Sequence, residues 1–235
     1  MKPTYFLIVL FLSAISFAKD GSHSPTTEHA QAAAHTHTEG VAAEQAFGFL
    51  KNGNTRFLKN QLRKDGQSKA DVARLSSGQK PHTIVLSCSD SRVPPEVVFD
   101  QKLGELFVVR TAGEALDPTS IASIEYAIEH LGSKLILVMG HTQCGAVKAA
   151  LATMDGKDAG SPNLNKLVAD IHPRIKDFAR KPASTNYLEE GWANTQGVAK
   201  DLQTRSTIIA EKAKTGAIEI KTGIYHLEDG HVEFK

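Results

Sequence analysis

The chain has 235 residues and a formal net charge of +1 at neutral pH. A charge balance of this kind gives no electrostatic reason to expect nucleic acid or an anionic membrane surface as a partner. Hydrophobic residues make up 41% of the sequence and charged residues 23%, which is typical of a globular protein, and the length suits one α/β domain.

The first 18 residues have the pattern of a secretory signal peptide. Lys2 is the only charge before Lys19, an uninterrupted apolar stretch covers 5–12, and SFA at 16–18 offers the small residues that favour cleavage. The alternative is an uncleaved anchor helix, but a membrane span needs about 20 apolar residues. We therefore expect export to the periplasm, removal of residues 1–18, and no membrane span afterwards.

Residues 19–42 are rich in alanine, threonine, serine and histidine and have no hydrophobic periodicity. Such a composition is typical of a disordered linker. This stretch contains four histidines, His23, His29, His35 and His37. They are either solvated or able to bind a metal ion, for which the closely spaced last two form the best pair. We expect the folded domain to cover 43–235.

Three apolar runs predict buried parallel strands: TIVLS at 83–87, LFVVR at 106–110 and KLILVMG at 134–140. Continuous runs of Val, Ile and Leu are typical of strands that helices cover on both faces. Between the second and third runs, Asp117 and Pro118 begin a predicted helix and Gly132 ends it. A strand–helix–strand unit of this length predicts a right-handed crossover in a parallel sheet.

Further helices are expected around this sheet. One begins near Glu44, with a break at the NGN of 52–54, and another follows Cys144 directly. Two more cover roughly 164–180 and 187–214.

The end of the chain reads as two strands joined by the turn-forming pair Asp229-Gly230. The predicted fold class is therefore α/β. A single domain has a mostly parallel central sheet, flanking helices and an antiparallel C-terminal strand.

Cys88 and Cys144 are the two cysteines, and each follows an apolar run; His141 precedes Cys144 by three residues. Ligands bind outside the carboxyl ends of strands in open α/β sheets, so these side chains are expected at one edge. Two thiolates and an imidazole suit Zn²⁺, and three protein ligands are typical of a catalytic site. Two alternatives remain open: a disulfide between the cysteines, and a structural zinc with Asp90 as fourth ligand.

Asp90 and Arg92 alternate with serines directly after Cys88. This alternation puts both side chains on the same side of an extended segment as the cysteine. A carboxylate beside a metal can take a proton from the reacting water, and an arginine can hold that carboxylate ionised and oriented. An ordinary surface ion pair is the alternative, and it would contribute little to stability.

CSDSR at 88–92 together with HTQCG at 141–145 resembles the β-class carbonic anhydrases, here in an exported bacterial form. The likeness runs from about residue 44 to the C-terminus and includes GNTRF (53–57), SRVPPEVVFD (91–100), GELFVVRTAG (104–113) and SIEYAIEHLG (123–132). The resemblance implies that 43–235 is a catalytic domain with one zinc ion per chain. It implies Cys88, His141 and Cys144 as zinc ligands. Asp90 then either ligates the zinc in a closed site or pairs with Arg92 in an open one.

The resemblance also implies the reaction, which is the reversible hydration of CO2 to bicarbonate and a proton by hydroxide formed on zinc. It implies a homodimer or tetramer in which N-terminal helices pack on the partner. Relatives with a second, regulatory bicarbonate site carry tryptophan three positions before the first zinc cysteine, where this chain has Val85. We therefore do not expect that regulation. Two other functions remain open: hydrolysis of carbonyl sulfide or carbon disulfide on the same fold, and non-enzymatic zinc binding in the periplasm.

Overall fold

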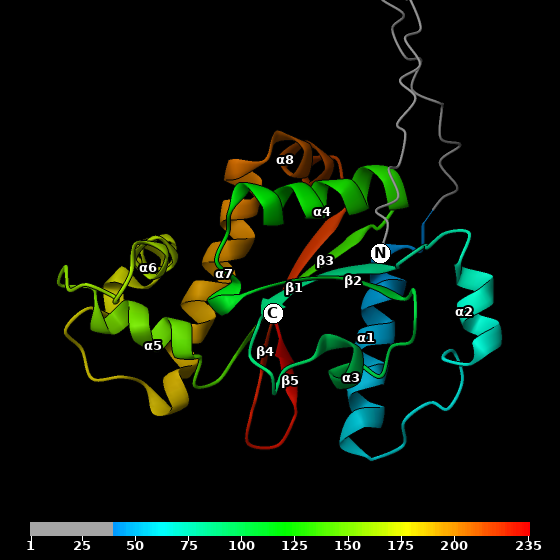
Figure 1. Ribbon diagram of the computed structural model, residues 1–235, viewed down its shortest axis with the longest axis horizontal. Coiled ribbons are helices and arrows are strands. Elements are labelled where there is room, and N and C mark those ends of the chain that lie inside the picture. Colours follow the sequence, from blue (N-terminus) through cyan, green and yellow to red (C-terminus); the bar gives the residue numbers. More distant parts are fainter. Residues whose placement is uncertain (1–39) are drawn as a thin grey trace, which may run out of the picture. The chain divides into compact units, whose positions relative to one another are not determined.

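A five-stranded sheet, in the order β2-β1-β3-β4-β5, forms the centre of the computed structural model (Figure 1), which describes residues 40–235. The strands are β1 (Thr83–Cys88), β2 (Leu106–Thr111), β3 (Leu135–His141), β4 (Glu219–Tyr225) and β5 (Val232–Phe234). β1, β2, β3 and β4 run parallel to one another, and β5 is antiparallel to β4. This arrangement confirms the predicted fold class. The predicted signal peptide and the linker up to residue 39 lie outside the described residues.

Eight helices surround the sheet within residues 40–235. They are α1 (Ala43–Leu58), α2 (Lys69–Leu75), α3 (Pro95–Val98), α4 (Pro118–Leu131), α5 (Gly145–Ala152), α6 (Pro162–Ile175), α7 (Leu188–Arg205) and α8 (Thr207–Lys214). None of them combines the length and the apolar character that a membrane span requires. Periodicity does not predict α2 and α3 because each has two turns or fewer.

The boundaries of α4 follow from its capping residues, as predicted. The Asp117 carboxylate accepts a hydrogen bond from the Ser120 amide at 2.6 Å, and Gly132 ends the helix in the left-handed conformation with φ of 72°. The single helix predicted over 187–214 is wrong. Ser206 has an extended backbone that ends α7, and its hydroxyl accepts a hydrogen bond from the Ile209 amide at the start of α8.

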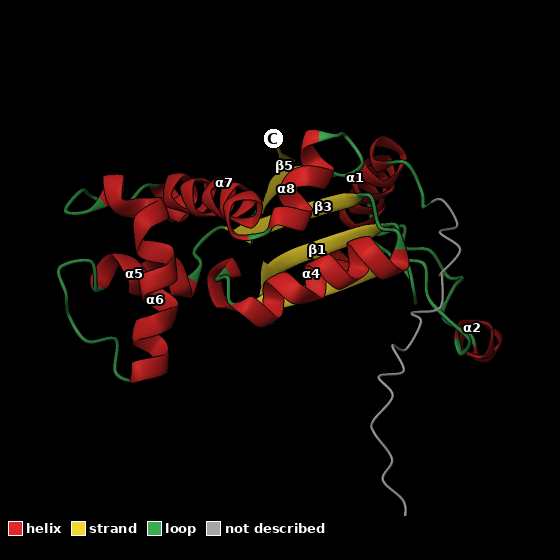
Figure 2. Cartoon of the chain, turned by 90° about the horizontal axis from the view of Figure 1, so that it is seen from above, coloured by secondary structure: helices red, strands yellow, loops and turns green. Residues whose placement is uncertain are grey.

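Successive residues of the central strands point to opposite faces of the sheet, so each strand contributes to two core clusters. Ile84 and Leu86 of β1 pack with residues of α4, α7 and α8, whereas Val85 packs with residues of α1 and α3. Figure 1 shows α4 and α8 above the sheet and α1 and α3 below it. In Figures 1 and 2, α5 and α6 lie together on the side of the sheet away from α2. Burial on both faces explains why β1 and β3 read as unbroken apolar runs.

The predicted helix break at 52–54 is wrong, because α1 continues through all three residues. Asn54 is buried, and its amide nitrogen donates hydrogen bonds to the carbonyls of Val98 and Gly230. Gly53 lets α1 approach the chain after α3, since a Cβ there would lie 1.7 Å from the Phe99 carbonyl oxygen. Tertiary packing thus stabilises the helical conformation of this polar segment.

The two glycines inside α1 provide a matched pair of variants. Gly53→Ala should lower the free energy of unfolding by about 1–3 kcal/mol, because its Cβ meets a backbone carbonyl that cannot rotate away. Gly48→Ala meets nothing within 4 Å and should gain up to about 1 kcal/mol from helix propensity. Urea unfolding of the two variants and the parent measures both changes. Equal midpoints for the two variants would contradict the close approach at Gly53.

Candidate metal centre

The ends of two neighbouring strands bring the two cysteines and one histidine together. β1 and β3 are adjacent and parallel, Cys88 is the last residue of β1, and His141 is the last residue of β3. Cys144 follows after a short turn and is the residue that caps α5. The Sγ atoms of Cys88 and Cys144 are 4.0 Å apart, and the three ligand atoms all lie within 4.8 Å of one another. The predicted meeting of these side chains at one sheet edge is therefore observed.

The donor atoms of this cluster fit a zinc ion. His141 Nδ1 lies 2.8 Å from the carbonyl oxygen of Thr142, which places the proton on Nδ1 and leaves the Nε2 lone pair free. Nε2 is buried and has no hydrogen-bond partner among the described residues, although buried polar atoms are normally paired. Both cysteines are free thiols, in contrast to the disulfide alternative. Two sulfur atoms and one imidazole nitrogen form a donor set that zinc prefers.

The two buried thiols differ in their affinity for a proton. The hydrogen bond from the Cys144 thiol, together with His141 and the Gly113 amide, lowers the pKa of Cys88 to about 4. The same hydrogen bond and burial raise the pKa of Cys144 far above its usual value. Burial and the charge on Cys88 also raise the pKa of the Glu114 carboxyl group well above its usual value. Without metal, the pair of thiols therefore keeps one proton, on Cys144.

Asp90 and Arg92 form a bidentate ion pair beside the cluster. Arg92 Nε donates to Asp90 Oδ1 at 2.9 Å, Nη2 donates to Oδ2 at 2.7 Å, and the Arg92 amide donates to Oδ1 at 3.0 Å. These hydrogen bonds hold the pKa of the Asp90 carboxyl well below its usual range. Asp90 Oδ2 is 3.9 Å from His141 Nε2, so the carboxylate lies next to the candidate metal position. Its service as a fourth ligand stays a prediction.

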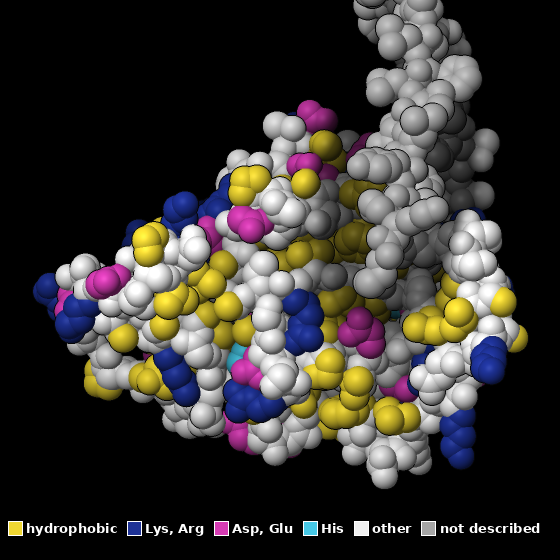
Figure 3. All heavy atoms as spheres, viewed as in Figure 1, with side chains coloured by type: hydrophobic (Ala, Val, Ile, Leu, Met, Phe, Trp, Pro, Cys, Tyr) yellow, Lys and Arg dark blue, Asp and Glu magenta, His cyan; other side chains and the backbone are white. Residues whose placement is uncertain are grey.

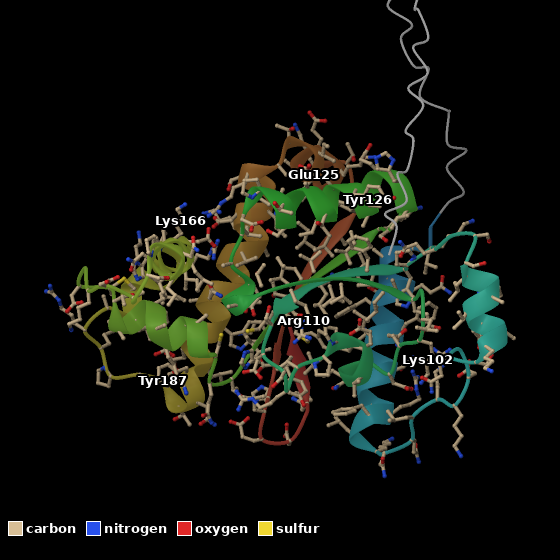
Figure 4. The ribbon with its side chains drawn as sticks, viewed as in Figure 1. Lys102, Arg110, Glu125, Tyr126, Lys166 and Tyr187 are labelled. Carbon is tan, nitrogen blue, oxygen red and sulfur yellow. The ribbon has the colours of Figure 1, made fainter. Side chains whose placement is uncertain are left out.

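Arg110 and Gly113 also form hydrogen bonds with the segment that carries Cys88 and Asp90. The sequence analysis did not identify either residue. Arg110, at the end of β2 (Figure 4), donates from Nε to the Cys88 carbonyl at 2.9 Å and from Nη2 to the Asp90 carbonyl at 2.6 Å. The Gly113 amide donates to Cys88 Sγ at 3.3 Å. A charged residue that ends an apolar strand run was the available signal for Arg110.

Side chains distant in sequence hold the turn between His141 and Cys144. The Thr142 hydroxyl donates to Glu228 Oε2 at 3.2 Å, and Asn186 Nδ2 donates to the other oxygen of that carboxylate. The Gln143 amide donates to the Asn186 carbonyl at 2.7 Å, and Gln143 has a left-handed backbone with φ of 57°. No local pattern identifies Asn186 or Glu228, because their contacts with the turn cross more than 40 residues.

A parallel sheet with a Cys–His–Cys centre at its carboxyl edge defines an α/β zinc protein, and comparison with known proteins gives its family. A family model described as "Carbonic anhydrase" matches residues 83–232. A carbonic anhydrase of Mycolicibacterium smegmatis is 40% identical over 195 residues, which cover 83% of this chain and 93% of that protein. The chain therefore belongs to the carbonic anhydrase family.

Solved structures of β-carbonic anhydrases share this fold. A β-carbonic anhydrase of Aspergillus fumigatus matches with a TM-score of 0.63 at 22% identity, over 82% of this chain and 89% of that one. One of two tetrameric β-carbonic anhydrases of Sordaria macrospora matches with a TM-score of 0.60 at 20% identity, over 81% of this chain and 96% of that one. These likenesses agree with the class that the two cysteine motifs resemble.

The proton on Cys144 predicts how zinc binding depends on pH. Zinc thiolate bonds require both cysteines to be deprotonated, so the ion must displace this proton. Because the pKa of Cys144 is raised, the thiol stays protonated across neutral pH in the metal-free protein. The apparent zinc affinity should therefore rise about tenfold per pH unit between pH 6 and 8 for each proton released. Competition with a chelator of known affinity measures this slope, and a flat dependence would contradict the assignment.

Proposed function

We propose that this carbonic anhydrase works outside the cytoplasm and as an oligomer, with Cys88, His141 and Cys144 holding one zinc ion per chain. Its reaction is the reversible hydration of CO2 to bicarbonate and a proton. The observation that carries the zinc assignment is the buried His141 Nε2, which has no hydrogen-bond partner within residues 40–235, beside two free thiols. Zinc, when bound, is a Lewis acid that lowers the pKa of water from about 16 to near 7.

In this proposal, the Asp90 carboxylate interacts with a proton of the reacting water. Its pKa lies below the usual range, so the carboxylate is ionised at neutral pH and can accept a hydrogen bond from that water at Oδ2. Arg92 orients it through two side-chain hydrogen bonds. The Arg92 side chain is 57% exposed, so water competes for this ion pair. Without its pairing to Arg92, Asp90 would be close enough to the candidate metal position to serve as a fourth ligand, which would give the closed form of the site.

The surroundings of the two thiols suit a small apolar substrate. Cys88 and Cys144 belong to one apolar cluster with Val147, Val168 and Ile171. CO2 has no charge and needs little binding apparatus, so apolar walls next to the metal position are sufficient. The named relative and family model favour CO2 over carbonyl sulfide or carbon disulfide as the substrate.

An exposed apolar surface supports the proposed oligomer. Leu62, Val97 and Leu103 are 43%, 50% and 48% exposed, and all three line one groove of about 410 Å³. Figure 3 shows apolar side chains gathered in the region of α3, which carries Val97. The nearby strand β2 lies at the edge of the sheet. Exposed apolar patches and edge strands are typical of surfaces that a partner covers. A second copy of the chain is the proposed partner, in a dimer or tetramer.

Stopped-flow CO2 hydration with zinc content measured on the same samples tests the function. The parent protein should be active with one zinc per chain, and more active on CO2 than on carbonyl sulfide. Cys88→Ser, Cys144→Ser and His141→Ala should lose zinc and activity together. Asp90→Asn and Arg92→Ala should keep zinc and lose at least about a hundredfold in rate.

Asp155→Asn is the matched control for Asp90→Asn, because Asp155 forms an exposed ion pair with Lys157. It should hydrate CO2 at the parental rate. An inactive, zinc-loaded parent protein would refute the function. Parental activity of Asp90→Asn, or loss of its zinc, would refute the role of that carboxylate alone.

Processing and assembly are tested on protein expressed from the full-length gene in a bacterial host. Protein recovered from the periplasmic fraction should begin near Lys19, as N-terminal sequencing reads it, and should sediment as a dimer or tetramer. Removal of 19–42 should leave CO2 hydration unchanged. Retention of residues 1–18 would contradict export with cleavage, and a monomer with full activity would contradict the proposed assembly.

A further inference from the structure

The turn that follows β2 is an unusual backbone segment next to Cys88. It spans Ala112–Glu114, and both Gly113 and Glu114 have left-handed backbones, with φ of 62° and 53°. Glycine adopts this conformation freely, whereas a glutamate there costs about 1–2 kcal/mol and needs support from its surroundings. The turn carries one of the hydrogen bonds to the site, because the Gly113 amide donates to Cys88 Sγ at 3.3 Å.

Asn194 of α7 supplies that support from the other side of the turn. Its Nδ2 donates one hydrogen bond to the Gly113 carbonyl at 2.8 Å and one to Glu114 Oε2 at 3.1 Å. Asn194 and Glu114 are 0% and 1% exposed. A single carboxamide therefore fixes the backbone of one left-handed residue and the side chain of the next, in a place without competing solvent.

A buried arginine in turn contacts the side-chain oxygen of Asn194. Arg174 of α6 lies 3.4 Å from Asn194 Oδ1 through Nη1, and its side chain is 2% exposed. Arg174 also forms ion pairs with Asp170 at 2.8 Å and with Asp201 at 2.9 Å. The carboxamide orientation is thus set by a donor that the surrounding carboxylates hold in place.

We propose that Asn194 is a positioning residue of the zinc centre: it holds the Gly113–Glu114 turn so that the Gly113 amide donates to Cys88 Sγ. A thiolate that accepts such a hydrogen bond is stabilised and oriented for the metal. The proposal rests on the proposed role of Cys88 as a zinc ligand. It extends the site to a residue of α7 that contacts none of the three ligand side chains by a hydrogen bond among the described residues.

Asn194→Leu tests the proposal, with Gln101→Leu as the matched control. Gln101 is also a buried carboxamide, and it donates to the Phe99 carbonyl at 2.6 Å while its oxygen lies 3.0 Å from His82 Nε2, before the start of β1. Both variants lose buried hydrogen bonds, but only Asn194 supports the turn at the metal centre. The zinc dissociation constant should rise about 10–100-fold in Asn194→Leu and stay within about twofold in Gln101→Leu.

A second readout needs no metal. Amide hydrogen exchange of Gly113, followed by NMR on the metal-free protein, should accelerate at least tenfold in Asn194→Leu and should be unchanged in Gln101→Leu. Asn194→Ser, which leaves room for a water molecule and keeps a hydroxyl donor, should give an intermediate zinc affinity. An unchanged zinc affinity and Gly113 exchange rate in either Asn194 variant would overturn the proposal. So would failure of both Asn194 variants to fold beside a folded Gln101→Leu, because Asn194 would then act on stability alone.

Cys88→Ser separates this proposal from the proposed function. If Cys88→Ser binds zinc as tightly as the parent, the ligand assignment itself fails. If Cys88→Ser loses zinc while Asn194→Leu keeps parental affinity, the zinc centre stands and only the positioning role of Asn194 fails.

Discussion

Parallel pairing of β1 with β3 positions the candidate zinc ligands and the elements around them. The register of this pair places the end of β1 beside the end of β3, and so brings Cys88 next to His141. A parallel pair needs a long crossover between its strands, and α4 and β2 lie within that crossover. Helices on both faces then bury the apolar side chains of the two strands, which stabilises the register and with it the distance between the ligand atoms.

Burial of the sulfur and nitrogen donor atoms suits them to bind a metal ion, but it also makes the charged thiolates energetically unfavourable. Buried thiolates are unfavourable unless hydrogen bonds or a cation compensate their charge. The chain provides hydrogen bonds from the Gly113 amide to Cys88, and Arg110 ties the backbone carbonyls of Cys88 and Asp90 to the end of β2. Asn194 and Glu228 brace the two turns around the cluster from other elements. A divalent cation supplies the remaining compensation, which is why metal binding and folding are expected to be coupled.

The sequence predicts the site better than it predicts the elements around it. CSDSR and HTQC each follow an apolar run, and the rule that parallel strands end at one edge is enough to bring their side chains together. The contacts of Arg110 and Asn194 were not predictable, because they depend on how β2 pairs with β1 and on how α7 packs against the turn after β2. At Asn54, tertiary contacts overrule the local sequence pattern. Its local pattern indicates a break, but its buried hydrogen bonds to distant carbonyls keep it inside α1.

Zinc K-edge X-ray absorption of the zinc-loaded protein tests the identity of the zinc ligands, because it reports the atoms around the metal without relying on activity. We predict two sulfur atoms at about 2.3 Å and nitrogen or oxygen atoms at about 2.0–2.1 Å. Cys88→Ser, if any zinc remains bound, should show one sulfur atom. A zinc environment without sulfur, or one with four sulfur atoms, would contradict the centre formed by Cys88, His141 and Cys144.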